Sequence, residues 1–109
     1  MSGSGKKPFG LNVAPIFEPS SVAVVGASED EGALGTVVLR NLLKNRFKGK
    51  VYPVNPKHKK VQGRRCYASV EAIKPTVDLA VIVTPANTVA DILEACGAKD
   101  VPAAIVISA

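Results

Sequence analysis

The sequence predicts an α/β protein with a Rossmann-like, doubly wound parallel sheet and helices on both faces. Two observations predict it. Apolar runs rich in β-branched residues alternate along the chain with segments of helical spacing. The runs are continuous rather than alternating, which is typical of strands buried on both faces in helix-covered parallel sheets. Short strand–helix–strand units of this kind favour parallel crossover connections.

Length and composition fit one such domain. The chain has 109 residues, 47% of them hydrophobic and 21% charged, which is a globular composition. No apolar run approaches the roughly 20 residues that span a bilayer, and the polar start lacks the hydrophobic stretch of a signal peptide. We therefore expect a cytoplasmic protein without a membrane partner. Residues 1–15 are interpreted as a flexible N-terminal arm or cloning remnant, and residues 16–109 as the domain.

The first half of the chain predicts two strands around one helix. Residues 21–26 form the first strand, and apolar residues at helical spacing predict a helix over residues 34–45. Residues 50–55 form the second strand. Because Pro53 cannot donate to a ladder, this strand should lie near a sheet edge or contain a bulge.

A basic stretch follows the second strand. Residues 57–65 are polar and basic. Residues 66–67 predict a short strand, and Ser69 is placed to cap a single helical turn that ends at residue 73.

The last third predicts another strand–helix–strand unit. Residues 77–83 form the clearest buried strand, and residues 103–108 form the fourth. Between them, Asn87 is expected to cap a helix, and Gly97 lies where a C-terminal glycine is expected. Asp78 opens its strand at the amino end, which indicates a structural role.

Ligands of such sheets bind at the carboxyl ends of the strands, close to the point where the strand order reverses. The segments that follow the four strands are therefore the candidate site. They are Gly26-Ala27-Ser28, Asn55-Pro56-Lys57, Thr84-Pro85-Ala86 and Ser108-Ala109.

The turn after the first strand is a candidate phosphate-binding loop. Its glycines permit a tight turn, and the start of the next helix offers free N–H groups with a partial positive charge. Ser28 can donate its hydroxyl to the same oxygens. The turn is neither GxGxxG nor a P-loop, and Glu29, Asp30 and Glu31 oppose a polyanion unless they point outward. A plain strand-to-helix turn that uses glycine for geometry explains the segment equally well.

The positive charge is concentrated around the second strand. The segment from Arg40 to Arg65 holds ten of the fourteen Lys and Arg residues and no acid, and a solvated basic surface accounts for most of them. The strand ends in Asn55-Pro56-Lys57, without the acidic residue that binds ribose in NAD domains. A phosphorylated ribose needs a positive field, so NADP or coenzyme A fits better than NAD. Aromatic residues are only 5% of the chain and no RNA- or DNA-binding motif is present, which argues against nucleic acid.

The chain lacks the residues for zinc, redox or triad chemistry. Cys66 and Cys96 are far apart in sequence and are interpreted as buried free thiols in a reducing compartment. His58 is the single histidine. We therefore expect no metal site and no catalytic residue.

Four segments, taken in order, resemble a known family. They are residues 17–28 (FEPSSVAVVGAS), 49–56 (GKVYPVNP), 77–86 (VDLAVIVTPA) and 104–109 (AIVISA). The family is the N-terminal CoA-binding domain of NDP-forming (ADP-forming) acyl-CoA synthetases, such as the ADP-forming acetate–CoA ligase, related to the α subunit of succinyl-CoA synthetase. The resemblance covers residues 16–109 and implies a domain that holds coenzyme A along the strand ends.

The resemblance also implies a role for each end of the ligand. The residues expected at the pyrophosphate are Gly26, Ala27, Ser28, Leu34 and Gly35. The residues expected at the adenosine are Val54, Asn55 and Pro56, with Lys57 near the ribose phosphate. The residues expected along the pantetheine arm are Val83, Thr84, Pro85, Ala86, Ile107 and Ser108.

Two departures from the family bear on function. Many relatives carry proline where this chain has Glu31. The family also continues past the fourth strand, with a phosphorylatable histidine in a following domain and an ATP-grasp domain or subunit that binds nucleotide. We interpret the chain as a non-catalytic, truncated fragment of an acyl-CoA ligase that converts acyl-CoA, ADP and phosphate to acid, CoA and ATP, or the reverse. Its expected partners are coenzyme A and those downstream ligase domains or the ATP-grasp subunit.

Two alternatives remain open. One is a regulatory Rossmann module that senses CoA or NAD(P). The other is a part of a CoA-synthetase-like protein acetyltransferase.

Overall fold

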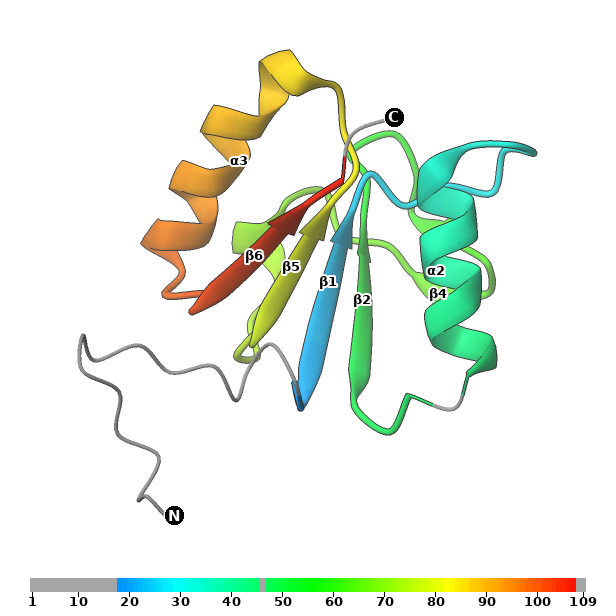
Figure 1. Cartoon of the computed structure of the whole chain (residues 1–109), viewed down its shortest axis with the longest axis horizontal. Helices are drawn as coiled ribbons and strands as arrows, with labels where there is room; N and C mark the ends of the chain where they lie inside the picture. Colours follow the sequence, from blue (N-terminus) through cyan, green and yellow to red (C-terminus); the bar gives the residue numbers. More distant parts are fainter. Residues whose placement is uncertain (1–17, 46, 108–109) are drawn as a thin grey trace.

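The computed structural model describes residues 18–45 and 47–107. It has one four-stranded parallel sheet in the order β2–β1–β5–β6 (Figure 1). The strands are β1 (Ser21–Val25), β2 (Lys50–Val54), β5 (Leu79–Ile82) and β6 (Ala103–Val106). The two helices are α2 (Leu34–Lys44) and α3 (Ala86–Ala98). The predicted Rossmann-like fold is confirmed, with each strand shorter than predicted; the proposed arm at residues 1–15 lies outside the described residues.

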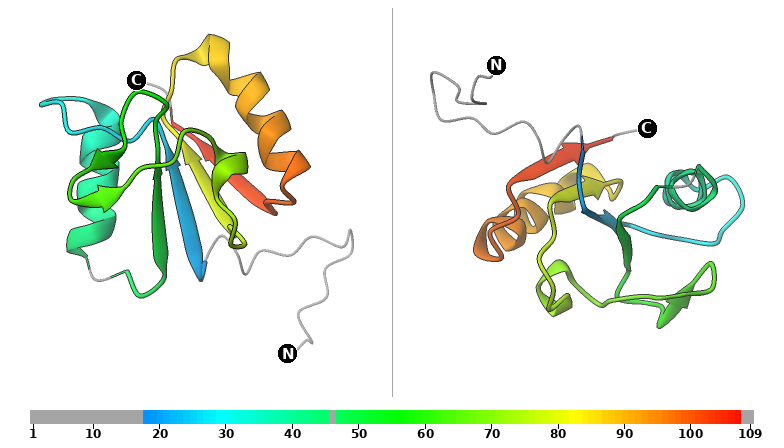
Figure 2. Two further views of the ribbon diagram at one scale, coloured as in Figure 1. Left: turned by 180° about the vertical axis from the view of Figure 1, so that it is seen from behind. Right: turned by 90° about the horizontal axis from the view of Figure 1, so that it is seen from below.

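The helices cover opposite faces of the sheet (Figure 2). Alternate side chains of β1 separate two cores: Val24 belongs to the cluster that contains Leu39 of α2, whereas Val25 belongs to the cluster that contains Cys96 of α3. All five residues of β1 are buried. A strand buried on both faces explains why its sequence is a continuous apolar run.

The strand order reverses beside β1. This strand pairs with β2 on one side and with β5 on the other, and Val25 is level with both Val54 and Ile82. The carboxyl ends of the three strands therefore meet at one rim, which is where ligands of such sheets bind. β2 is an edge strand, as Pro53 predicted.

A short hairpin lies within the polar, basic segment of residues 57–65. β3 (Lys60–Val61) and β4 (Arg64–Arg65) pair antiparallel. The connecting Gln62 and Gly63 both have positive φ, 51° and 78°, as tight hairpin turns require. Strands of two residues are too short to show a period, so this hairpin could not be predicted from the sequence pattern.

The connection to β5 contains the predicted helical turn. η1 (Val70–Ala72) is a 3-10 turn, and the Ser69 side chain accepts a hydrogen bond from Ala72 N at 3.3 Å. The strand predicted at residues 66–67 is reduced to a single bridge between Val54 and Tyr67.

The predicted ends of α3 were wrong. The helix begins at Ala86 with Pro85 as its N-cap, so Asn87 lies within the first turn. Pro85 has φ of −56° but no polar side chain that could accept a hydrogen bond from the first N–H groups of the helix. The helix continues through Gly97, and the left-handed residue beyond it is Asp100, with φ 61°. Neither helix in the described residues is long and apolar enough to cross a membrane.

Asp78 has the structural role that its position predicted. Its Oδ2 accepts a hydrogen bond from Ser20 N at 2.8 Å, and its own N–H donates to Ser21 Oγ at 3.0 Å. These bonds connect β1 and β5 at the amino end of the sheet, opposite the binding rim.

Gly35 allows α2 to pack directly on the turn that follows β1. A Cβ atom at Gly35 would overlap the carbonyl oxygen of Gly26 and come within 2.9 Å of its carbonyl carbon. Both obstacles are backbone atoms, so neither can rotate away. The helix start and the strand end can therefore lie this close only if residue 35 has no side chain.

We predict that Gly35→Ala lowers the free energy of unfolding by about 1–3 kcal/mol, because the methyl group must push α2 away from the sheet. The matched control is Gly97→Ala. A Cβ at Gly97 meets nothing within 4 Å, so this helical substitution should raise the free energy of unfolding by up to about 1 kcal/mol. Urea denaturation measures both, and equal effects of the two substitutions would contradict the packing argument.

Candidate functional site

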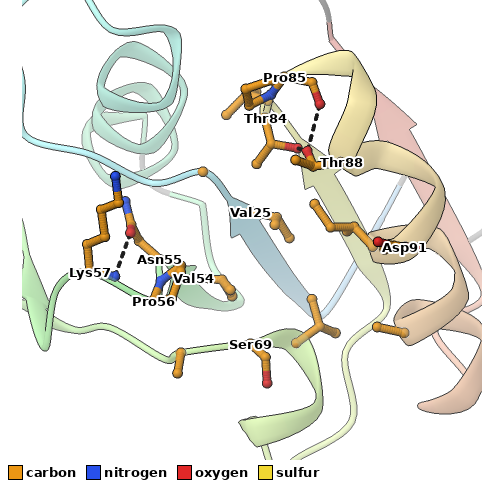
Figure 3. A pocket seen from close by; sticks show the side chains of 16 residues that line it. Val25, Val54, Asn55, Pro56, Lys57, Ser69, Thr84, Pro85, Thr88 and Asp91 are labelled. Carbon is orange, nitrogen blue, oxygen red and sulfur yellow. Dashed lines mark hydrogen bonds between the residues drawn. The ribbon is translucent and has the colours of Figure 1, made fainter.

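A cavity of about 630 Å³ opens at the carboxyl ends of β1, β2 and β5 (Figure 3). It lies on the side of the sheet that α3 covers. Residues 54–57 form the wall beside β2, residues 68–70 form the floor, and the opposite wall belongs to α3. Its volume is in the range of small-molecule sites. The rim predicted from the strand ends is therefore hollowed rather than filled.

The turn after β1 connects this cavity to the start of α2. Gly26 lines the cavity and has φ of 99°, and a Cβ there would lie 2.9 Å from Val83 Cγ2. The N–H groups of Gly26 and Ala27 both donate to the Val54 carbonyl oxygen, at 2.9 and 3.2 Å. Because the Val54 carbonyl oxygen already accepts both N–H groups, these two amides are not free to donate to a phosphate. They hold the end of β1 to the end of β2.

Free donors lie instead at the first turn of α2. Within residues 18–45 and 47–107, the N–H groups of Leu34 and Gly35 have no acceptor. Ala33 provides no side-chain cap, and the first turn contains no acidic residue. The partial positive charge of this helix end is therefore not neutralised by its own residues, which suits an anion.

The rest of the turn is held by its own hydrogen bonds. Ser28 is buried, and its Oγ accepts a hydrogen bond from Asp30 N at 2.9 Å. The hydroxyl hydrogen of Ser28 is left for another acceptor. Glu29, Asp30 and Glu31 are all exposed, so the acidic tip lies at the surface.

Two amide side chains fix the turn from outside. Asn55 Nδ2 donates to Ala27 O at 2.9 Å, while Asn55 Oδ1 accepts from Lys57 N at 2.9 Å. Gln62 Nε2 donates to both Ser28 O and Thr36 O, at 3.0 and 3.1 Å. The basic hairpin is thereby joined to the turn and to α2.

Comparison with known proteins is consistent with this geometry. A family model described as a CoA binding domain matches residues 20–109. The chain belongs to this family of CoA binding domains.

Several similar proteins are much longer than this CoA binding domain. It is 50% identical over 94 residues to the ADP-forming acetate–CoA ligase I of Archaeoglobus fulgidus, covering 86% of this chain and 13% of that protein. It is 41% identical over 96 residues to the ADP-forming 4-hydroxybutyrate–CoA ligase of Nitrosopumilus maritimus, covering 88% and 14%. A solved structure of the Candidatus Korarchaeum cryptofilum dinucleotide-forming acetyl-coenzyme A synthetase 1, with phosphate and ADP, superimposes with a TM-score of 0.86 at 43% identity and covers 89% of this chain and 21% of that one. The chain thus spans about an eighth to a fifth of these proteins.

The residues predicted for CoA fall into two groups in the CoA binding domain. Those that line the cavity are Gly26, Val54, Asn55, Pro56, Lys57, Val83, Thr84 and Pro85. Those that do not line it are Ala27, Ser28, Leu34, Gly35, Ala86 and Ile107. Ile107 packs with the core cluster beneath α2, on the other face of the sheet. Ser108 lies outside the described residues.

Sequence reasoning missed one wall and the floor of the cavity. The lining residues that were not predicted are Val25, Ala68, Ser69, Val70, Thr88, Asp91, Ile92 and Ala95. Those on α3 are three or four positions apart and share one helix face, a spacing visible in the sequence. The floor comes from residues 68–70, which lead into the 3-10 turn η1, and the position of this segment facing α3 has no sequence signal.

The two thiols of the CoA binding domain are free and buried, as predicted. Burial raises the pKa of the Cys66 thiol, although a hydrogen bond to the Asn55 carbonyl oxygen (3.6 Å) opposes this shift. Burial also raises the pKa of Cys96. A raised pKa leaves less thiolate at neutral pH, so neither thiol is suited to be a nucleophile. Among the described residues, no group of three or more His, Cys, Asp and Glu side chains could hold a metal ion.

We predict that Asn55→Ala lowers the free energy of unfolding by about 1–3 kcal/mol, because the buried Ala27 carbonyl loses its donor. Asn87→Ala is the matched control: Asn87 is exposed on α3 and makes no recorded side-chain hydrogen bond in the described chain. It should change stability by less than about 0.5 kcal/mol. Urea denaturation distinguishes the two, and an Asn55 variant as stable as the Asn87 variant would contradict the role given to Asn55.

Proposed function

We propose that this chain binds coenzyme A and serves as the CoA-holding module of an ADP-forming acyl-CoA ligase. The observation that carries the proposal is the cavity at the carboxyl ends of β1, β2 and β5, with the unneutralised start of α2 beside it. The named relatives support it, because one is a ligase for acetate and another for 4-hydroxybutyrate. The acids differ, and coenzyme A is what the two names share.

Each end of the ligand has a matching surface. The adenosine end fits the apolar cavity beside Val54 and Pro56, with the Lys57 ammonium toward the ribose phosphate. The pyrophosphate fits the free amides of Leu34 and Gly35, where the helix end favours negative charge. The pantetheine arm would leave the rim past Thr84, toward the ends of β5 and β6.

The chain's own part in the reaction is binding and orientation. The parent enzyme would convert acyl-CoA, ADP and phosphate to acid, CoA and ATP, or run the reverse. This module would hold CoA by its nucleotide end and leave the thiol free to reach groups beyond the sheet edge. The phosphorylatable histidine and the ATP-grasp domain or subunit would be supplied by other parts of the parent protein.

Calorimetric titration of the full chain tests this proposal. We expect CoA to bind, and 3′-dephospho-CoA to bind about three- to tenfold more weakly because the ribose phosphate no longer meets the exposed Lys57 ammonium. Lys57→Gln should weaken CoA binding and remove the preference between the two compounds.

Lys50→Gln is the matched control, since Lys50 is exposed at the opposite end of β2. It should retain both the affinity for CoA and the preference. Absence of CoA binding to the unmodified chain would contradict the proposed function. Equal affinities for the two compounds would contradict only the role of Lys57.

A further inference from the structure

The polar side chains that line the cavity differ in whether they are already hydrogen bonded. Thr88 Oγ1 donates to the Pro85 carbonyl oxygen at 2.6 Å and lies 2.7 Å from Thr84 Oγ1, with which it shares a second hydrogen bond. Asn55 uses both ends of its amide within the protein. The Ser69 hydroxyl accepts a hydrogen bond from Ala72 N at 3.3 Å. Four of the six polar side chains that line the cavity are therefore hydrogen bonded within the fold.

The two charged residues that line the cavity, Lys57 and Asp91, have no side-chain partner in the described part of the chain. Neither the Lys57 ammonium nor the Asp91 carboxylate makes a hydrogen bond or a salt bridge with residues 18–45 and 47–107. They stand on opposite walls of the cavity: Lys57 follows β2, and Asp91 belongs to α3 (Figure 3). Both are exposed, so a ligand can reach them without a change in the fold.

The surface between the two charges is mostly apolar. Val25 and Val54 come from the sheet, Val70 from the floor, and Ile92 and Ala95 from α3. A flat apolar ring buries well against such walls, whereas a phosphate does not. The cavity therefore suits a ligand with an anionic group at the Lys57 wall, a ring in the middle and a hydrogen-bond donor at the Asp91 wall.

A carboxylate is an unusual residue in a site for a polyanion. A carboxylate repels phosphate, so it must lie against a part of the ligand that is far from every phosphate group. That part of the ligand must also carry an N–H donor for the carboxylate to accept. In CoA, the exocyclic amino group of adenine is at the far side of the purine from the ribose. The adenine edge offers this N6–H₂ donor, whereas a 6-oxo purine offers an acceptor at the same position.

We propose that Asp91 is a specificity-determining residue, whose carboxylate accepts a hydrogen bond from the adenine N6 amino group of CoA. This inference rests on the proposed CoA-binding function and adds the base selectivity of the site. The same carboxylate would repel the O6 atom of a 6-oxo purine, so the site would reject the hypoxanthine form of the ligand. We do not expect the pantetheine amides to contact Asp91. The pantetheine arm is uncharged, so it would gain no electrostatic attraction from the Lys57 ammonium on the opposite wall.

The test compares two ligands that differ at one position of the base. CoA and its hypoxanthine analogue, in which the N6 amino group is replaced by oxygen, are titrated against the full chain by calorimetry. We expect about a tenfold preference for CoA, which corresponds to about 1.4 kcal/mol. Asp91→Ala should bind CoA about tenfold more weakly and bind both compounds within about twofold of each other.

Glu94→Ala is the matched control. Glu94 is another exposed acid on α3, and it does not line the cavity. It should preserve both the affinity and the base preference. Because both substitutions are at exposed helix positions, circular dichroism should show the same fold and thermal midpoint for each.

The outcomes separate this inference from the function on which it rests. Binding of CoA by the unmodified chain without a base preference would overturn the role of Asp91 and leave the proposed function standing. A tenfold preference that survives in Asp91→Ala would overturn it as well. Weaker binding of 4′-phosphopantetheine to Asp91→Ala would place the carboxylate at the pantetheine arm and also overturn it. Failure of the unmodified chain to bind either form of CoA would overturn both proposals.

Discussion

The close approach of α2 to the end of β1 is the constraint on which the rest of the structure depends. It requires that residue 35 have no side chain, because the Gly26 carbonyl occupies that space. The same turn is held on its other side by Val54, whose carbonyl oxygen accepts the N–H groups of both Gly26 and Ala27. A helix start, a central strand end and an edge strand end are thus brought to a single point, and the site is built around it.

This junction decides which groups are available to a ligand. The N–H groups of Gly26 and Ala27 donate to Val54 and so join β1 to β2. The free N–H donors at this junction are therefore those of the first turn of α2. The cavity lies on the other side of the turn, beneath α3, with Lys57 and Asp91 on facing walls. An anion-binding helix end and an apolar pocket are therefore placed side by side but on different faces of the sheet. A long ligand with a ring at one end and a diphosphate in its middle can use both.

The sequence contains much of this fold but less of the site. Strands β1 and β5 were predictable because a strand buried on both faces must be apolar throughout, and Pro53 marked β2 as an edge strand. The ends of α3 were not predictable. Pro85 is the N-cap in place of Asn87, and the left-handed residue after the helix is Asp100 in place of Gly97. The occupied amides of Gly26 and Ala27 could not be foreseen, because their acceptor is in another strand. The placement of Lys57 and Asp91 on facing walls of the cavity likewise depends on tertiary packing, which leaves no local pattern in the sequence.

The most direct measurement is a titration of the ¹⁵N-labelled chain with CoA, followed by amide chemical shifts. The account predicts that the amides of Leu34 and Gly35 shift most strongly among backbone groups, together with residues of the cavity walls. Amides at the amino end of the sheet, such as Ser20 and Asp78, should stay unchanged. Saturable shifts confined to that amino end, or to the basic hairpin alone, would contradict the claim that the start of α2 receives the diphosphate.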